Sequence, residues 1–323
     1  MSAALLTVSD LEVRYAGART PAVHGLSFEL GQGGSLAIVG ESGSGKSTAA
    51  LALTRLLPRD ARVRAGEIAF EGRDLQRLGA RELRALRGRR IAMVFQDPAG
   101  SWNPTRRIGV QLRDGLRAAG LGDEARGRVL ELLRRVGIQN PERRLEEYPH
   151  HLSGGMLQRI MIAGALAAGP SLLIADEPTS ALDATVQAEL LALLAELRAE
   201  TGLALLIISH DLAVVARVAE RTVVLYAGKA VEQAPTGALF SGARHPYTLG
   251  LLRSTPRRTD APKTPLAAMR AGEVAARGCP FAPRCPLAVE RCVVEEPGPR
   301  RVGASTVACH RAEEVQALAA RPA

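Results

Sequence analysis

The sequence is short of lysine, of aromatic residues and of long apolar runs. Only three of its 42 cationic side chains are lysines, and aromatic residues make up 3% of the chain. The most apolar run, residues 160–175, is interrupted by glycine and proline, and a membrane-spanning helix needs about 20 apolar residues. The N-terminus lacks the basic stretch and apolar core of a secretory signal. We therefore expect neither a membrane span nor an export signal.

Arginine accounts for the positive balance of the chain. Lys+Arg is 42 and Asp+Glu is 33, so the formal net charge is +9. Such a charge suits nucleic acid or an anionic membrane surface, but an arginine-rich composition without either partner gives the same sum. Hydrophobic residues make up 46% and charged residues 23% of the 323 positions. These fractions are typical of a folded globular protein and exclude a mostly disordered chain.

Strand and helix patterns alternate along the first 245 residues. Alternating or wholly apolar runs predict strands, and stretches with one apolar face predict helices. The expected strands are 11–15, 26–30, 35–39, 66–72, 91–96, 172–175 and 203–209. The expected helical stretches are 46–57, most of 106–169, and 185–201. This alternation predicts an α/β fold with a mainly parallel sheet.

A glycine-rich loop, residues 40–48, lies between an expected strand and an expected helix. It reads Gly-Glu-Ser-Gly-Ser-Gly-Lys-Ser-Thr and fits the pattern G-x-x-x-x-G-K-[ST]. Gly43 and Gly45 let the backbone curl so that its N–H groups point at phosphate oxygens. Lys46 places a charge on the β- and γ-phosphates, and Ser47 offers a hydroxyl to Mg²⁺. We predict that this phosphate loop binds a nucleotide.

Further motifs follow the phosphate loop in a fixed order. Residues 152–159 read Leu-Ser-Gly-Gly-Met-Leu-Gln-Arg, residues 172–178 read Leu-Leu-Ile-Ala-Asp-Glu-Pro, and residues 180–183 read Ser-Ala-Leu-Asp. A histidine, His210, follows the strand expected at 203–209. Together these segments resemble the ATP-binding subunits of ABC transporters from residue 5 to about residue 240. The resemblance implies a mainly parallel sheet with an N-terminal antiparallel part and an inserted helical subdomain.

The resemblance also assigns roles to individual residues. It implies that Glu177 is the general base, that His210 senses the γ-phosphate, and that Asp183 belongs to the D-loop. It implies that the signature residues Ser153, Gly154, Gly155 and Met156 contact a nucleotide on an opposite, head-to-tail subunit. It implies Mg²⁺ contacts from Ser47, Gln96 and Asp176. The implied ATP contacts are Tyr15, Gly40, Ser42, Gly43, Ser44, Gly45, Lys46, Ser47, Thr48 and Gln96.

Several of these residues also have an ordinary structural interpretation. Two adjacent acids after a strand often cap a helix, and a lone histidine commonly has a structural role. Tyr15 could equally be an ordinary core tyrosine, and Gln96 an ordinary surface glutamine. Many family members carry Gln where this chain has Met156, and a side-chain contact at that position would be lost. Backbone contacts would survive, because they depend on the N–H groups of the glycines.

Other segments resemble one branch of the family, the peptide and nickel importers. These are residues 148–156, 101–104 and 245–249, together with a cysteine-containing tail. The resemblance implies a peripheral protein on the cytoplasmic face of the inner membrane, paired with a second and different ATPase subunit. It implies two membrane permease subunits, contacted near Gln96 and residues 106–169, and a solute-binding protein. The implied cargo is di- or oligopeptides, with nickel or a metal–chelator complex as the alternative.

The four cysteines, Cys279, Cys285, Cys292 and Cys309, are separated by five, six and sixteen residues. Four thiolates can bind zinc or an iron–sulfur cluster, and the spacing has none of the close pairs typical of zinc sites. Free or disulfide-bonded cysteines are the third interpretation. The resemblance to importer ATPases favours a [4Fe–4S] cluster, with zinc as the alternative.

The chain is expected to divide at residue 245. Residues 1–245 would form the ATP-binding domain, with a helical subdomain over about 100–169, and residues 246–323 an extension of irregular structure rich in Pro, Arg and Cys. An ATPase of this type acting on DNA or ribosomes is the remaining alternative. It would use the positive charge, but only 103 residues separate Thr48 from Leu152, too few for the long coiled coil of repair ATPases. We therefore expect no nucleic acid partner.

Overall fold

The fold is described from a computed structural model of the chain, which describes residues 4–122, 125–255 and 272–319. The chain separates into two compact units. The first unit comprises residues 1–7, 29–35 and 68–208, and the second comprises residues 8–28, 36–67 and 209–323. Some strands contribute residues to both units: β1 (Ala4–Tyr15), β2 (Val23–Gly31), β3 (Ser35–Val39), β5 (Glu67–Phe70) and the last residue of β9 (Ala204–Ser209).

The first unit contains a parallel sheet and a group of helices. Strands β7 (Ile91–Val94), β8 (Leu172–Asp176) and β9 (Ala204–Ser209) pair in parallel, with β8 in the centre. All five residues of β8 are buried, as expected of a strand covered on both faces. The short strand β6 (Arg73–Asp74) pairs antiparallel with β5. The helices are α2 (Ala80–Leu86), α3 (Ile108–Ala118), α4 (Ala125–Arg135), α5 (Pro141–Leu145), α6 (Gly154–Ala167) and α7 (Ala184–Thr201), with a 3₁₀ turn at Pro149–His151.

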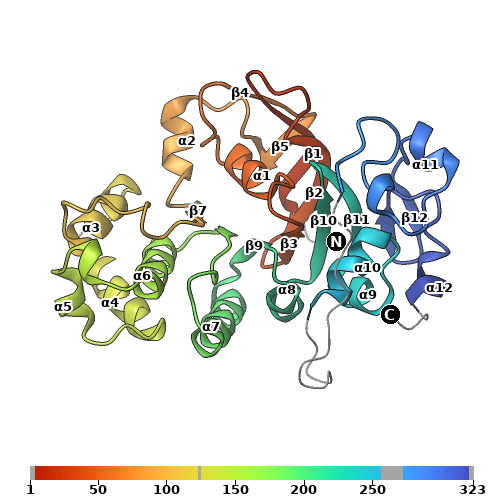
Figure 1. Cartoon of the computed structure of the whole chain (residues 1–323). Coiled ribbons are helices and arrows are strands. Elements are labelled where there is room, and N and C mark those ends of the chain that lie inside the picture. Colours follow the sequence, from red (N-terminus) through yellow and green to blue (C-terminus); the bar gives the residue numbers. More distant parts are fainter. Residues whose placement is uncertain (1–3, 123–124, 256–271, 320–323) are drawn as a thin grey trace. The chain divides into compact units, whose positions relative to one another are not determined.

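Helices α3, α4, α5 and α6 lie together in Figure 1. Apolar side chains of α3 and α4 recur at every third or fourth position, and Leu112, Leu116, Val129 and Leu133 are buried. This spacing buries one face of each helix. The helical stretch expected at 106–169 is therefore confirmed as helices joined by short turns.

The second unit contains the phosphate loop and the C-terminal part of the chain. Strand β10 (Arg221–Tyr226) pairs in parallel with β3 and antiparallel with β11 (Lys229–Pro235). The strand β4 (Ala61–Arg64) pairs antiparallel with β1. The helices are α1 (Lys46–Leu53), α8 (Leu212–Val218), α9 (Thr236–Gly242), α10 (Pro246–Arg253), α11 (Glu290–Val294) and α12 (Val315–Ala319), with a 3₁₀ turn at Ala282–Arg284.

Two predicted elements differ from the structure. The helix expected to run to residue 57 ends at Leu53, because Arg55 adopts a left-handed φ of 51° before the chain reaches Pro58. The extension is more regular than its composition predicts. Its hairpin β12 (Arg300–Val302) and β13 (Ser305–Val307) pairs with β11 and lengthens the sheet. Each strand has three residues, too few to produce a sequence period. Residues 256–271 of the predicted extension lie outside the described residues.

None of the described helices is both long and apolar enough to span a membrane.

Candidate functional site

The phosphate loop joins β3 to α1, as the sequence predicts. Gly40 and Gly45 have φ values of 155° and 97°, which favour glycine over residues with a side chain. Space is equally restrictive, because a Cβ on Gly40 would lie 2.2 Å from the carbonyl oxygen of Leu225, and one on Gly45 would lie 2.2 Å from that of Ala22. The loop backbone therefore passes so close to its neighbours that only glycine fits at these two positions.

The polar groups of the loop are arranged for an anion. The buried Lys46 donates from Nζ to the carbonyl oxygens of Gly40 and Glu41, each at 2.8 Å. Among the described residues, the buried Ser44 Oγ has no hydrogen-bond partner. Buried polar atoms are normally hydrogen-bonded, and a phosphate oxygen in the loop would give this hydroxyl an acceptor. The loop fits a bound phosphate chain.

Tyr15, the predicted adenine contact, lies beside the start of α1. Its Oη is 3.3 Å from Thr48 Oγ1, so the end of β1 and the end of the phosphate loop are brought together within the second unit. His210, in the same unit, is exposed directly after β9. The next residue, Asp211, caps α8 by accepting hydrogen bonds from the N–H groups of Ala213 and Val214.

Asp176 and Glu177 lie at the carboxyl end of β8 in the first unit, and both are buried. Glu177 has a left-handed φ of 49°, which is uncommon for a residue with a side chain. Its N–H donates to the carbonyl oxygen of Ile208 at 2.9 Å. The chain therefore turns sharply at Glu177, at the edge of the sheet where ligands of α/β proteins bind.

The signature segment and the D-loop meet within the first unit. Ser153 caps α6, and its Oγ accepts from the N–H of Met156 at 3.3 Å. A Cβ on Gly155 would lie 3.1 Å from Leu182 Cδ2, so the start of α6 packs against residues 181–182. Asp183 caps α7 by accepting from the N–H groups of its first turn at 3.0 and 3.1 Å. Ser153 and Gly154 are exposed, which leaves the start of α6 accessible.

The predicted Mg²⁺ ligands come from both units. Ser47 belongs to the second unit, and Asp176 and the exposed Gln96 belong to the first. In the described part of the chain, no three His, Cys, Asp or Glu side chains form a group that could hold a metal ion. Mg²⁺ bound together with a nucleotide needs only one or two protein ligands, because phosphates and water complete its shell. Ser47, Gln96 and Asp176 each carry a side-chain oxygen, the type of donor that Mg²⁺ prefers.

All four cysteines line one cavity in the second unit. Cys279, Cys292 and Cys309 are buried, Cys285 is half-buried, and all four are free thiols. Burial and the neighbouring thiols raise the pKa of Cys309 to about 12 and that of Cys285 to about 11. The thiols of Cys285 and Cys309 therefore stay protonated at neutral pH, and their thiolate forms would require a positive partner.

Several polar contacts within the second unit, two of them at the phosphate loop, were not predicted from the sequence. Arg284, between the first two cysteines, forms a bidentate ion pair with Glu41 at 2.7 and 2.8 Å. Tyr247 Oη accepts from the Glu41 N–H at 2.8 Å. The buried Glu232 accepts from Ser305 Oγ and from the N–H of His245, and burial raises the pKa of its carboxyl group. No spacing along the chain signals these contacts, because their partners are far apart in sequence.

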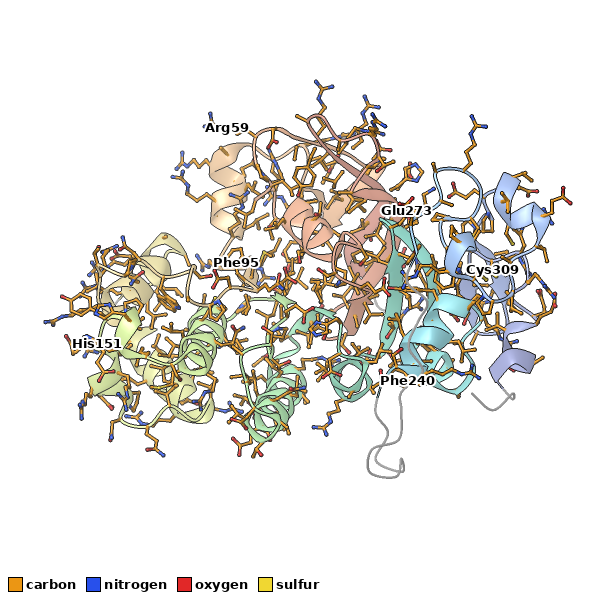
Figure 2. The ribbon with its side chains drawn as sticks, in the orientation of Figure 1. Arg59, Phe95, His151, Phe240, Glu273 and Cys309 are labelled. Atoms are coloured by element: carbon orange, nitrogen blue, oxygen red, sulfur yellow. The ribbon has the colours of Figure 1, made fainter. Side chains whose placement is uncertain are left out.

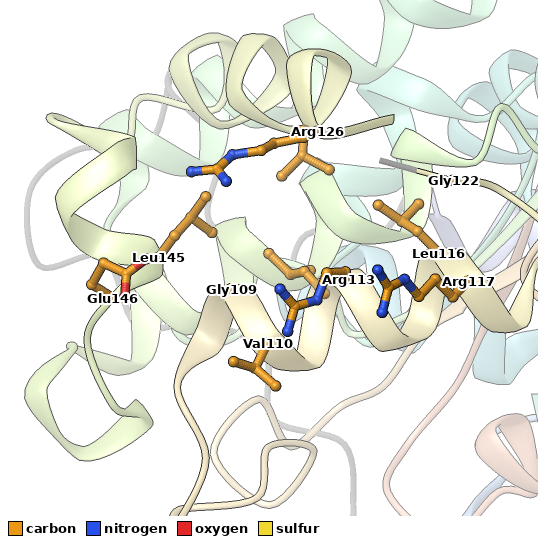
Figure 3. Close-up of a pocket in the computed structure, with 11 residues that line it drawn as sticks. Gly109, Val110, Arg113, Leu116, Arg117, Gly122, Arg126, Leu145 and Glu146 are labelled. Atoms are coloured by element: carbon orange, nitrogen blue, oxygen red, sulfur yellow. The ribbon is translucent and has the colours of Figure 1, made fainter. Parts of the chain in front are cut away.

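Two further cavities belong to the first unit. One of about 330 Å³ lies between α3, α4 and α5 and carries the guanidinium groups of Arg113, Arg117 and Arg126 (Figure 3). The other, of about 250 Å³, is mainly apolar and includes Met93, Phe95 and Trp102. Phe95 is 37% exposed directly after β7 (Figure 2). None of the predicted ATP contacts lines either cavity.

Comparison with known proteins gives two family matches. A family model described as ABC transporter matches residues 23–180. A second model, described as Oligopeptide/dipeptide transporter, C-terminal region, matches residues 231–292. The second match includes three of the four cysteines.

Curated relatives match over nearly the whole chain. The "Dipeptide transport ATP-binding protein DppD" of Haemophilus influenzae is 45% identical over 316 residues, which cover 95% of each chain. The protein of the same name from Escherichia coli is 46% identical over 303 residues, covering 91% of this chain and 92% of the relative.

Solved structures confirm the fold. The dimeric ATP-binding cassette MJ0796, bound to ADP and Pi in a post-hydrolysis state, matches with a TM-score of 0.64 and 27% identity, covering 72% of this chain and 98% of that one. The cbiO1 subunit from Clostridium perfringens matches with a TM-score of 0.62 and 30% identity, covering 74% and 91%. The predicted α/β fold with a phosphate loop is therefore confirmed.

Proposed function

The chain belongs to the ATP-binding subunits of ABC transporters, and from this premise we propose that it hydrolyses ATP to power the import of di- and oligopeptides. The observation that carries the choice of cargo is the match of residues 231–292 to the C-terminal region of oligopeptide/dipeptide transporters. Relatives 45% and 46% identical over nearly their full length are named for dipeptide transport. These names support peptides over nickel or a metal chelate.

The phosphate loop is the proposed site of the β- and γ-phosphates. Its N–H groups and the start of α1 favour negative charge, and Lys46 would exchange the two loop carbonyls it now contacts for phosphate oxygens. Ser44 Oγ, buried without a partner among the described residues, would donate to the phosphate chain. Tyr15 would stack on the adenine, with its hydroxyl near Thr48. Gly40, Ser42, Gly43, Gly45 and Ser47 complete the proposed contacts.

Hydrolysis requires a base beside the γ-phosphate. We assign this role to Glu177, which would accept a proton from the attacking water. Its buried position after β8 and its backbone hydrogen bond to Ile208 hold the carboxylate at the edge of the sheet. Gln96, Asp176 and Ser47 would hold Mg²⁺, which offsets charge on the phosphates. His210 would contact the γ-phosphate.

A second ATPase subunit is the proposed partner for the signature residues. The accessible start of α6, with Ser153, Gly154, Gly155 and Met156, presents N–H groups that could bind a γ-phosphate across a head-to-tail interface. The contact between α6 and residues 181–182 would link this start to the D-loop residue Asp183. The solved cassette MJ0796 is dimeric, which supports the pairing of two such subunits. A heterodimer with a related but different ATPase is proposed here.

Two membrane permease subunits and a solute-binding protein complete the proposed importer. The apolar cavity of about 250 Å³ that includes Met93, Phe95 and Trp102 supports a permease contact next to Gln96, because exposed apolar concavities commonly bind a partner. The chain would lie on the cytoplasmic face of the inner membrane as a peripheral subunit. The domain boundary near residue 245 and the helical subdomain at about 100–169 belong to the same proposal.

We also propose that Cys279, Cys285, Cys292 and Cys309 together bind a [4Fe–4S] cluster. The support is that four free, mostly buried thiols line one cavity. Iron and sulfide analysis of anaerobically purified protein tests this proposal. Stoichiometric zinc without absorbance near 400 nm would contradict it.

Uptake by a strain that lacks this gene tests the transport function. Labelled dipeptide, a longer peptide and nickel would be supplied in parallel, and the strain complemented with wild type, Glu177→Gln or Glu189→Gln. The last variant is a matched control, because Glu189 is exposed on α7. We expect wild type and the control to restore peptide uptake and Glu177→Gln to fail. Restoration of nickel uptake alone would contradict the peptide assignment.

A further inference from the structure

Glu41, the second residue of the phosphate loop, is held through all of its polar groups. Its carboxylate receives two hydrogen bonds from Arg284, at 2.7 and 2.8 Å. Its N–H donates to Tyr247 Oη at 2.8 Å, and its carbonyl oxygen accepts from Lys46 Nζ at 2.8 Å. Arg284 and Tyr247 both belong to the C-terminal part of the second unit, so that part of the chain sets the position of Glu41.

Arg284 is itself held rigidly. Its side chain is only 10% exposed, and its guanidinium carbon lies 5.6 Å from the ring centroid of Tyr226 and 5.7 Å from that of Phe281. A planar guanidinium that packs near two aromatic rings and also binds a carboxylate with two hydrogen bonds loses little further entropy on pairing. A lysine could not reproduce this arrangement, because its ammonium group makes no bidentate contact.

The aromatic rings around Arg284 join three segments of the chain. Tyr226 of β10 lies 4.7 Å from Tyr247 of α10, and Phe281 of the cysteine-containing segment lies 5.2 Å from Tyr226 and 5.4 Å from Tyr247. Such rings pack favourably at these centroid distances. The cysteine-containing segment is therefore connected to the phosphate loop by an unbroken series of contacts.

The charge of Glu41 explains why a partner is needed. An unpaired carboxylate in the loop would repel the triphosphate that the same loop binds, and this repulsion grows in a partly buried site. Arg284 cancels that charge. It also draws the carboxylate toward residues 279–285.

We propose that Arg284 is a positioning residue for the phosphate loop, which holds Glu41 from within the cysteine-containing segment 279–309. ATP affinity then depends on the folded state of that segment. The inference rests on the proposed assignment of residues 40–48 to the phosphates of ATP. It adds a contact that couples the C-terminal segment to nucleotide binding.

A double-mutant cycle on the full-length chain tests the coupling. Calorimetric titration with Mg·ATP would compare wild type, Arg284→Ala, Glu41→Gln and the double variant, with Arg277→Ala as the matched control. Arg277 is an exposed arginine that lies two residues before Cys279 in the sequence. We expect Arg284→Ala to weaken ATP binding by about tenfold, the size typical of a lost charged hydrogen bond. In the Glu41→Gln background the same change should alter the Kd by less than about twofold.

Several results would overturn the proposal. One is an unchanged Kd in Arg284→Ala, and another is a loss of equal size in both backgrounds, which would mean that Arg284 acts elsewhere. If Arg284→Ala does not fold, Arg284→Lys keeps the charge but loses the bidentate contact, and it should still weaken binding. Wild type that binds ATP no better than Lys46→Ala would instead contradict the assignment of residues 40–48.

Amide hydrogen exchange gives a second, reciprocal readout. If the segment and the nucleotide are coupled, ATP must stabilise the segment as much as the segment favours ATP. We expect saturating ATP to slow exchange across residues 279–309 in wild type and not in Glu41→Gln. Equal slowing in both proteins would contradict a path through Glu41.

Discussion

Replacing Tyr247 by phenylalanine isolates one hydrogen bond at the phosphate loop. The ring of Tyr247 is fully buried and packs against Tyr226 and Phe281, and phenylalanine would keep that packing. The change removes the acceptor 2.8 Å from the Glu41 nitrogen. A buried N–H left without its partner costs about 1–3 kcal/mol, and we expect the local stability of the loop to fall by that amount.

Exchange of the Glu41 amide proton, measured by NMR on the full-length chain, reports this cost directly. A loss of 1–3 kcal/mol corresponds to roughly 5- to 150-fold faster exchange. Tyr226→Phe is the matched control, because its hydroxyl makes a longer contact of 3.4 Å with Arg284 and does not reach Glu41. Unchanged exchange in Tyr247→Phe, or an equal change in the control, would refute the reasoning.

Three further predictions concern the loop, the D-loop helix and acid stability. Gly45→Ala should abolish ATP binding, because its Cβ would lie 2.2 Å from a carbonyl oxygen. Gly43→Ala has open space around its Cβ and should lower the free energy of unfolding by only about 1–2 kcal/mol, for its left-handed backbone. ATP titration and thermal unfolding of both variants would check this. Asp183→Ala should destabilise the protein by about 1 kcal/mol through loss of the α7 cap, and Asp183→Asn should largely preserve it in denaturant unfolding. Burial lowers the pKa of His245 to about 3 from 6.5; since the unfolded state binds a proton first, stability should fall as the pH drops from 6.5 toward 3. His245→Asn keeps a capping side chain without titrating, and a pH series of melting temperatures that is equally steep in both proteins would contradict this assignment.

The sequence predicted the phosphate loop well because its chemistry is local. A buried strand, a glycine-rich turn and a helix follow one another without interruption, and the spacing of Gly40, Gly45 and Lys46 is a property of one short segment. The same is true of Asp176 and Glu177 after β8. The start of α6 at the signature residues, with Ser153 as its cap, falls within the helical stretch expected at 106–169.

Predictions failed where short elements or distant partners decide the structure. The extension forms a hairpin and short helices, because three- to five-residue elements are stabilised by the sheet and core they join and leave no period in the sequence. The ion pair between Glu41 and Arg284 spans 243 positions. In the sequence, Arg284 is indistinguishable from the other arginines of an arginine-rich chain. Glu41 occupies a position of the loop pattern at which any residue is allowed.

The sequence by itself determined the fold class, the nucleotide-binding loop and the family, because each depends on residue types at fixed local spacing. Only the tertiary structure decided which distant groups meet. It placed Tyr247 and Arg284 on the backbone and side chain of Glu41, and it gathered four thiols around one cavity. The physical reason is that burial and packing bring these groups together through many weak contacts. Each contact depends on residues that are distant in sequence, so no single position of the chain reveals it.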